Sequence, residues 1–414
     1  MKDPLREIAD LRRILDVARH MAVVTDLDVL LGTIVEAACG VLGCERATIY
    51  LYDSGRRELY SRVATGIDAI RFPADRGIAG AAATARACVN VPDAYADARF
   101  NPEFDRKHGF RTRNLLAIPL ENLDGDLIGV VQAINKRGAA FDPDDEALAE
   151  ALSAQAGVAL ERARLLEQYA EKQRMQRDLD LARSIQQGLF PKRDPHVPGY
   201  EIAGWNRPAD ETGGDCYDFI PLPDGRLALL LADATGHGIG AALVIAEARS
   251  LVRALLSVTD DLARVAVAVN RLLAHDLAGD RFVTAFLGVL DPVRHCVEYV
   301  SGGQGPLLLV TREEAVQRPA NALPFAVLDE LDQVEIGRFD LAPRATLVLL
   351  TDGFYEAGDP QGELFGEARV ISFIQGRAAE PLGDTIVALH DAIQLFTRNA
   401  PQADDLTALL VRRL

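Results

Sequence analysis

Apolar residues recur at helical spacing at the start of the chain: Leu5, Ile8, Leu11, Ile14, Leu15 and Ala18. Side chains three or four positions apart share one face of a helix, so this pattern predicts an N-terminal helix within residues 1–24. A second helix is expected from residue 27 to about 42. Four strand-like runs follow, at 47–52, 59–64, 115–120 and 127–134. Because Asp124-Gly125 between the last two is a typical hairpin turn, residues 25–160 are expected to form a compact α+β domain.

A long, increasingly polar helix is expected from about residue 144 to 190. Its apolar residues form only a thin stripe: Leu165, Tyr169, Met175, Leu179, Ala182, Ile185 and Leu189. One helix cannot bury such a stripe on itself. The segment is either a solvated connector or a parallel two-helix coil in a homodimer, and we favour the homodimer although Lys172, Gln173 and Gln176 interrupt the seam. Three prolines end the helix, which makes 161–197 a helical linker: Pro191, Pro195 and Pro198.

Residues 198–414 alternate strand-like runs with helical blocks at about 239–257, 261–276 and 383–398, before a final strand. The chain of 414 residues is long enough for two or three domains. Its net charge of −17 argues against nucleic acid as the main partner. The five scattered cysteines indicate a reducing compartment, and no apolar run reaches about 18 residues. We therefore expect a cytoplasmic protein without a membrane span.

Acidic residues stand at the ends of apolar runs in this last region. They occur in four short motifs: Gly213-Gly214-Asp215, Asp233 to Gly238, Thr351-Asp352-Gly353 and Asp404-Asp405-Leu406-Thr407. Carboxylates at several strand ends can converge in space, and such a cluster is costly unless cations fill it. Oxygen ligands suit magnesium or manganese, so we predict a metal-dependent hydrolase.

Strand geometry narrows the predicted ligand set. Successive side chains of a strand face opposite sides, so only one member of each pair, Asp215 or Asp218 and Asp404 or Asp405, is expected to reach the metals. We predict Asp215, Asp233, Asp352 and Asp404 as catalytic metal ligands, with the backbone carbonyl of Ala234 as a further oxygen ligand. Two divalent ions held this way would activate a bridging water and clamp the phosphoryl oxygens during in-line attack.

Taken together, these motifs resemble the metal-dependent serine/threonine phosphatases of the PPM family, in the branch of the bacterial SpoIIE and RsbU phosphatases. The resemblance also covers Phe282-Val283-Thr284-Ala285 and the segment 182–191 before the domain. It implies an α-β-β-α sandwich with two Mn or Mg ions between the sheets, bound by the four aspartates named above. It further implies a phosphorylated STAS-type anti-anti-sigma protein as substrate.

Two details of this domain are open. Relatives commonly carry Asn-Ala-Gly-His where this chain has 301–304, Ser-Gly-Gly-Gln, in a loop that is not expected to line the metals. His237 has two interpretations, because it could donate a proton to the leaving oxygen or only order its glycine-rich turn.

The first domain resembles GAF sensor domains, which contain a six-stranded antiparallel sheet, and specifically the cyclic-nucleotide-binding subgroup. The matching residues include Gly77 to Gly80, Asn90 to Tyr95, Gly109 to Asn114 and the set Asn135, Lys136, Phe141, Asp145 and Glu146. The resemblance implies that this last set supports the pocket, with an ion pair between Lys136 and Asp145. It implies ligand contacts, to cAMP or cGMP, at Phe72, Ile78, Ala79, Tyr95, Asp105 and Thr112.

The sequence therefore predicts a phosphoprotein phosphatase regulated by a GAF domain. One alternative is a catalytically inactive cyclic-nucleotide receptor, which the intact aspartate set argues against. Another is a cyclic-nucleotide phosphodiesterase, for which His275-Asp276 and His390-Asp391 offer only a superficial metal-site pattern without further paired histidines.

Overall fold

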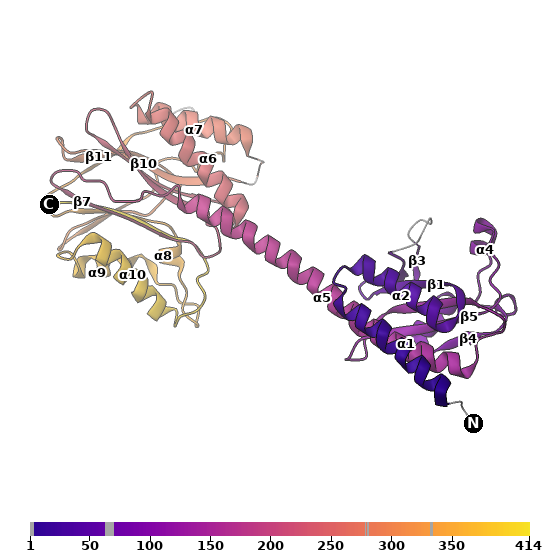
Figure 1. Ribbon diagram of the computed structural model, residues 1–414. Coiled ribbons are helices and arrows are strands. Elements are labelled where there is room, and N and C mark those ends of the chain that lie inside the picture. The colour runs from indigo at the N-terminus through magenta and orange to yellow at the C-terminus, as the bar shows by residue number, and fades with distance from the viewer. Residues whose placement is uncertain (1–3, 63–69, 278, 280, 332–333) are drawn as a thin grey trace. The chain divides into compact units, whose positions relative to one another are not determined.

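The computed structural model of the protein describes residues 4–62, 70–277, 279, 281–331 and 334–414 (Figure 1). It consists of two compact units, Met1–Met175 and Gln176–Leu414. Helix α5 (Pro143–Gln187) is a continuous helix of 45 residues that begins in the first unit and ends in the second. In the described ranges, no helix combines the length and apolarity that crossing a membrane requires.

The first unit is built on a six-stranded antiparallel sheet in the order β3-β2-β1-β6-β5-β4, as the GAF resemblance implies. The hairpin predicted at Asp124-Gly125 joins β5 to β6, and Gly125 has a φ of +81°. The strand predicted at 59–64 corresponds to β2, which ends at Tyr60. Residues 63 and 64 of the predicted range lie outside the described part. The strands are β1 (Cys44–Asp53), β2 (Glu58–Tyr60), β3 (Arg71–Pro73), β4 (Val89–Val91), β5 (Leu115–Glu121) and β6 (Leu127–Lys136).

Helices cover both faces of this sheet. One face packs against α1, α2 and the beginning of α5 through buried side chains such as Met21, Ile34 and Leu160. The other face packs against α3 through Ile78 and Ala82. The helices of this unit other than α5 are α1 (Pro4–Val23), α2 (Leu27–Leu42), α3 (Gly77–Ala85), the short 3₁₀ helix η1 (Ala94–Ala96) and α4 (Glu103–His108).

The second unit contains two five-stranded sheets that face each other. The first sheet has the order β14-β11-β10-β9-β8 and the second β13-β12-β15-β16-β7. Phe286, Tyr299 and Leu347 are among the apolar side chains buried between them. The strands are β7 (Tyr200–Arg207), β8 (Asp215–Pro221), β9 (Leu227–Ala234), β10 (Val283–Asp291), β11 (Cys296–Gly302), β12 (Leu307–Val310), β13 (Ala315–Arg318), β14 (Gly337–Asp340), β15 (Thr346–Leu350) and β16 (Leu406–Arg413).

Helices α6 and α7 pack on the outer face of the first sheet, and α8, α9 and α10 pack on the outer face of the second (Figure 1). The layers are therefore α-β-β-α, and the predicted fold class is confirmed. The three predicted helical blocks correspond to α6, α7 and α10, whereas α9 was not predicted. The bounds are α6 (Ile239–Leu256), α7 (Leu262–Asp276), α8 (Gly353–Glu356), α9 (Gly366–Gly376) and α10 (Leu382–Phe396).

Candidate metal centre and sensor cavity

The fold brings the four predicted aspartates to the same end of the two facing sheets. Asp215, the first residue of β8, lies directly opposite Asp233 of β9 in the first sheet. Asp352 follows β15 and Asp404 precedes β16, two neighbouring strands of the second sheet. The hydroxyl of Thr351, the residue before Asp352, donates to Asp215 (2.8 Å), so the strand ends of the two sheets meet at this cluster.

Asp215 forms the buried floor of this cluster. Its Oδ2 atom accepts hydrogen bonds from the hydroxyl of Thr351 (2.8 Å) and the hydroxyl of Thr407 (2.6 Å). Thr407 in turn accepts a hydrogen bond from the amide of Asn206 on β7 (2.7 Å). Thr407 belongs to β16 and Thr351 directly follows β15, so these bonds tie the two sheets together beneath the cluster. The sequence motifs contain the threonines, but sequence reasoning gave them no role.

Asp404 and Asp405 face in different directions, as strand alternation predicts. Asp405 is buried, and its carboxylate accepts hydrogen bonds from the backbone of Ala209 (2.7 Å) and of Asp215 (3.3 Å). Asp404 is exposed at the rim of the cluster, as is Asp352. Asp405 therefore stabilises the loop before β8, while Asp404 faces the side from which a substrate can approach.

The two glycines before Asp215 allow the backbone to approach its neighbours closely. A Cβ atom on Gly213 would lie 2.4 Å from Oδ2 of Asp405, and one on Gly214 would lie 2.8 Å from the carbonyl oxygen of Ala234. Neither distance leaves room for a side chain. The predicted ligand carbonyl of Ala234 thus lies against the same loop that presents Asp215.

Asp218 lies on the opposite face of β8 from Asp215, toward α6. Its fully buried carboxylate pairs with Nε of Arg249 (2.9 Å) and with Nη2 of Arg253 (2.9 Å). Both arginines belong to α6, so Asp218 connects this helix to the sheet. The structure places Asp218 on the opposite face of β8 from the carboxylate cluster, as the expectation that only one of the two aspartates faces the cluster requires.

Crowding of negative charge alters the acidity of the cluster. Burial and the charge of Asp233 raise the pKa of Asp215 well above its usual range. Burial, followed by the charges of Asp352 and Asp404, raises the pKa of Asp233 to about 7. Loss of solvent and the charges of Asp404 and Glu356 also raise the pKa of Asp352. A bound cation would favour the charged forms of all these groups.

The donor set fits hard divalent cations, because it consists of carboxylate and carbonyl oxygens. In the part of the chain that the structure describes, no three carboxylate, imidazole or thiol groups form a ready-made coordination shell. The fit therefore rests on the chemistry of the donors and on the mutual repulsion that cations would relieve. Asp215, Asp233, Asp352 and Asp404 are the residues that would hold such ions.

The side chain of Gln304 joins two strands next to this cluster. Its buried side-chain amide donates to the carbonyl of Leu350 (2.9 Å) and accepts from the hydroxyl of Thr284 (3.3 Å). Thr284 lies opposite Asp233 in the sheet, and Leu350 immediately precedes Thr351-Asp352. The loop, which was not expected to line the metals, thus bonds to β10 beside Asp233 and to the end of β15 before Asp352.

His237 lies on the rim, in the turn after β9. Its side chain is 91% exposed, and its Nδ1 atom is 3.3 Å from a carboxylate oxygen of Asp210. This position orders the turn against the loop before β8 and leaves the imidazole accessible to solvent.

The first unit contains a cavity of about 1080 Å³ between the sheet, α2, α3 and α4. Five of the six predicted ligand contacts line it: Phe72, Ile78, Ala79, Asp105 and Thr112. Tyr95 is 51% exposed and does not belong to the lining, because its ring packs on Phe100 and its hydroxyl donates to Asp105 (3.1 Å).

The side chains of Asp105 and Thr112 are bound to each other. The carboxylate of Asp105 accepts hydrogen bonds from the backbone amide (2.7 Å) and from the hydroxyl (2.9 Å) of Thr112. These two bonds reach both oxygens of the carboxylate, and Oδ2 also accepts a hydrogen bond from the hydroxyl of Tyr95. Asp105 therefore holds the wall of the cavity together, and the start of α3 offers the better binding groups, because no side chain caps its N-terminus near Ile78.

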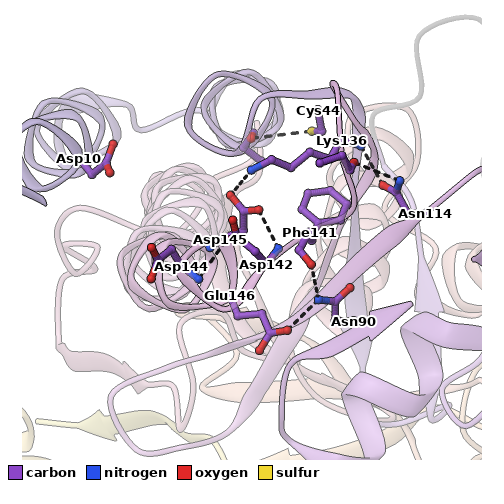
Figure 2. Close-up of polar contacts among 12 residues, drawn as sticks. Asp10, Cys44, Asn90, Asn114, Lys136, Phe141, Asp142, Asp144, Asp145 and Glu146 are labelled. Atoms are coloured by element: carbon purple, nitrogen blue, oxygen red, sulfur yellow. Dashed lines mark hydrogen bonds and ion pairs between the residues drawn. The ribbon is translucent and has the colours of Figure 1, made fainter. Parts of the chain in front are cut away.

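The five predicted pocket-supporting residues lie at the end of β6 and around the start of α5, and Figure 2 labels four of them: Lys136, Phe141, Asp145 and Glu146. The predicted ion pair between Lys136 and Asp145 is present. Asp145 also accepts a hydrogen bond from the backbone amide of Asp142 (3.0 Å), whose own carboxylate accepts from the amide of Asp145 (3.0 Å). This reciprocal arrangement caps the first turn of α5, so one carboxylate fixes the helix start to the sheet.

The remaining members of the set fix the surrounding loops. The side-chain oxygen of Asn135 accepts from the amide of Arg113 (2.6 Å), and its amino group donates to Glu45 (2.8 Å). Glu146 accepts a hydrogen bond from the amide of Asn90 (2.7 Å), and Phe141 is buried among apolar side chains (Figure 2). None of the five lines the cavity, which agrees with a supporting role.

Two family models match the chain. The GAF domain model matches residues 26–160, and the model of stage II sporulation protein E (SpoIIE) matches residues 223–414. Among solved structures, the SiaA-PP2C domain of Pseudomonas aeruginosa is similar, with 24% identity and a TM-score of 0.52. The similarity covers 59% of this chain and 98% of that domain, and it shows the fold of the second unit.

Curated relatives with cyclic-phosphodiesterase names match shorter stretches. The "Probable 3',5'-cyclic phosphodiesterase pde-5" of Caenorhabditis elegans is 30% identical over 179 residues, which is 40% of this chain and 24% of that protein. The "Dual 3',5'-cyclic-AMP and -GMP phosphodiesterase 11A" of Takifugu rubripes is 42% identical over 98 residues, which is 23% of this chain and 11% of that protein. The chain thus spans a quarter or less of the length of these two relatives.

Proposed function

The chain joins a GAF domain to a domain of the SpoIIE family, and on this basis we propose that it is a metal-dependent phosphatase of phosphoserine and phosphothreonine in proteins. The observation that carries the proposal is the meeting of Asp215 and Asp233 with Asp352 and Asp404 at one end of the facing sheets. Such a concentration of carboxylates is unfavourable by itself and suits a pair of divalent cations.

The four aspartates of the cluster differ in how deeply they are buried, and we assign them different roles on this basis. Asp215 and Asp233 form the inner part, where the hydroxyls of Thr351 and Thr407 keep the carboxylate of Asp215 in one orientation. Asp352 and Asp404 stand at the rim, where a phosphorylated side chain can approach from solvent. When bound, manganese or magnesium would supply an activated water and positive charge for the phosphoryl oxygens. The net charge of −17 makes this local positive charge necessary for binding an anionic substrate.

The activity is tested by phosphate release from a generic aryl phosphate and from phosphoserine proteins, with Mn²⁺ and with chelator. We expect release that depends on Mn²⁺ and that falls at least a hundredfold in Asp233→Asn, because a metal ligand is lost. Asp224→Asn is the matched control, since this exposed aspartate lies on the turn between β8 and β9, where it pairs with Arg226 (2.6 Å). Unchanged activity in Asp233→Asn refutes the proposed site.

We further propose that the sensor cavity binds a cyclic nucleotide. The cavity is large enough for a nucleotide, and the amides at the start of α3, near Ile78 and Ala79, offer hydrogen bonds to a cyclic phosphate. Phe72 lies in the cavity wall with its ring 5.1 Å from that of Tyr50, and it can flank a base. The names of the two phosphodiesterase relatives support this ligand class.

Calorimetric titration of the full chain with cAMP and with cGMP tests the ligand. Binding of either nucleotide, weakened by Phe72→Ala, supports the proposal. The absence of heat with both nucleotides at millimolar concentration contradicts it and leaves the phosphatase assignment unaffected.

The substrate that fits the resemblance is a phosphorylated STAS-type anti-anti-sigma protein in a partner-switching pathway. We also propose that the protein is a homodimer through α5, whose exposed apolar residues include Leu165, Tyr169, Leu181 and Ile185. A ligand in the sensor cavity can regulate the phosphatase only by favouring one arrangement of this helix over another. Sedimentation of Leu165→Glu, which places a charge in the stripe, tests the dimer: a monomer is expected, and an unchanged dimer contradicts the proposal.

The alternative of a catalytically inactive cyclic-nucleotide receptor predicts nucleotide binding without phosphate release. The alternative of a phosphodiesterase has less support from the structure. Its two His-Asp pairs lie on different layers, because His275 is at the end of α7 and His390 is buried on α10 beside Arg207 (3.0 Å). An assay for hydrolysis of cAMP and cGMP distinguishes the phosphodiesterase from the proposed phosphatase.

A further inference from the structure

The last turn of α5 binds the loop that presents the metal cluster. The side-chain amide of Gln186 donates from Nε2 to the carbonyl oxygen of Gly213 (2.6 Å) and accepts from the amide of Gly213 at Oε1 (3.1 Å). One side chain thus satisfies both polar backbone groups of one residue, as a neighbouring strand would. Sequence reasoning placed Gln186 only within a linker.

Gly213 is the position at which this contact can affect the cluster. It precedes Gly214 and Asp215, and it lies so close to the carboxylate of Asp405 that a Cβ atom would be 2.4 Å from its oxygen. The same carboxylate accepts from the backbone amide of Asp215 (3.3 Å). Gly213 is therefore held between Gln186 on one side and Asp405 on the other, two residues before the buried aspartate.

The residues after Gln186 fix the helix end on the same sheet. The ring of Phe190 packs on that of Tyr217 in β8, with 5.4 Å between centroids. Leu189 and Phe190 line a small gap together with Cys216 of β8 and Arg249 of α6. The end of α5 thus contacts the strand that carries Asp215 and the helix whose Arg249 pairs with Asp218.

We propose that Gln186 is a positioning residue through which the end of α5 sets the geometry of the metal centre. A hydrogen bond at these distances fails beyond about 3.5 Å, and one residue of helix rise is about 1.5 Å. A shift of the end of α5 along its axis by about one helical turn, about 5.4 Å, therefore breaks both bonds to Gly213 and loosens the loop before Asp215. This inference rests on the proposed metal centre and names the residue by which the helix controls it.

Calorimetric titration of the full chain with MnCl₂ tests the inference. We expect Gln186→Leu, which has a similar size and no polar groups, to bind Mn²⁺ about tenfold more weakly, as typically follows when a group that orients a ligand is lost. The neighbouring Gln187→Leu is the matched control, because Gln187 is exposed on the same helix turn. Gln186→Glu keeps only the acceptor for the Gly213 amide, so its affinity for Mn²⁺ should lie between those of the wild type and Gln186→Leu.

Aryl phosphate hydrolysis supplies a second readout. In Gln186→Leu the Mn²⁺ concentration for half-maximal activity should rise about tenfold, while the rate at saturating Mn²⁺ recovers to near that of the wild type. Mn²⁺ affinity equal to that of the wild type in Gln186→Leu overturns the inference, even if the variant melts at a lower temperature. If Gln186→Leu does not fold, Gln186→Glu is titrated instead, and a Mn²⁺ affinity equal to that of the wild type overturns the inference. If the wild type itself does not bind Mn²⁺, the proposed metal centre is refuted, and not only the role of Gln186.

Discussion

Replacing Thr407 by valine removes one hydroxyl from beneath the metal cluster and changes little else in size. The hydroxyl of Thr407 donates to the carboxylate of Asp215 at 2.6 Å and accepts from the amide of Asn206 at 2.7 Å. The substitution therefore leaves Asp215 with only the hydroxyl of Thr351 on Oδ2, and it leaves the amide of Asn206 without this partner.

The size of the effect follows from these two contacts. A hydrogen bond to a charged acceptor contributes about 1.5–3 kcal/mol. If the bond to Asp215 keeps the carboxylate in the orientation that binds metal, its loss weakens Mn²⁺ affinity by about ten- to a hundredfold. The bond from Thr407 lowers the pKa of Asp215, so its removal raises that pKa further and a proton competes better with the metal. The loss of affinity should therefore grow as the pH falls from about 8 to about 6.

Calorimetric Mn²⁺ titrations of wild type and Thr407→Val at both pH values measure this effect. Thr385→Val is the matched control, because Thr385 of α10 is also buried in the second unit and its hydroxyl donates to the carbonyl of Pro381, the residue before this helix (2.9 Å). The control should lose stability without losing affinity for Mn²⁺. Equal affinities of Thr407→Val and wild type at both pH values would refute the role assigned to the hydroxyl.

Three other predictions concern stability. Because the folded-state pKa of Asp233 is raised to about 7, the folded metal-free protein holds a proton that the unfolded chain has released between about pH 4 and 7. Its free energy of unfolding should fall as the pH rises through this window, as urea titrations with chelator would show, and a pH dependence unchanged in Asp233→Asn contradicts this. Asp218→Asn leaves two arginines beside a neutral amide and should cost about 3 kcal/mol of stability. The folded variant should still bind Mn²⁺ like the wild type, and loss of binding would place Asp218 among the ligands. Lys136→Met leaves the buried carboxylate of Asp145 without its cation and should destabilise the first unit by about 3 kcal/mol. A melting temperature like that of the wild type would contradict the proposed tie between β6 and α5.

Much of the fold follows from local patterns that the sequence displays directly. Helices α1, α6 and α7 have apolar residues at helical spacing, and the β5–β6 hairpin has an Asp-Gly turn. The aspartates were recognisable because each one interrupts or borders a buried strand. Helix α9 escaped prediction because Gly366 and Gly376 bound its short apolar stretch and resemble turn residues.

The parts that sequence reasoning missed depend on contacts between distant segments. Thr351 and Thr407 acquire a role only when the second sheet faces Asp215, 136 and 192 positions away in the chain. The bonds of Gln304 to Thr284 and Leu350 could not be predicted, because the loop pattern carries no information on which strand ends it joins. Tyr95 fits the ligand-binding motif in sequence, but its hydroxyl is directed to Asp105, and this orientation depends on the fold of the loop around it.

The central claim is that carboxylates from two sheets hold a pair of divalent ions. The most direct test is a crystal of the protein grown with manganese and measured for anomalous scattering at the manganese edge. The account predicts two strong peaks among Asp215, Asp233, Asp352 and Asp404. A map without peaks among these four residues, in a crystal that contains manganese, would contradict it.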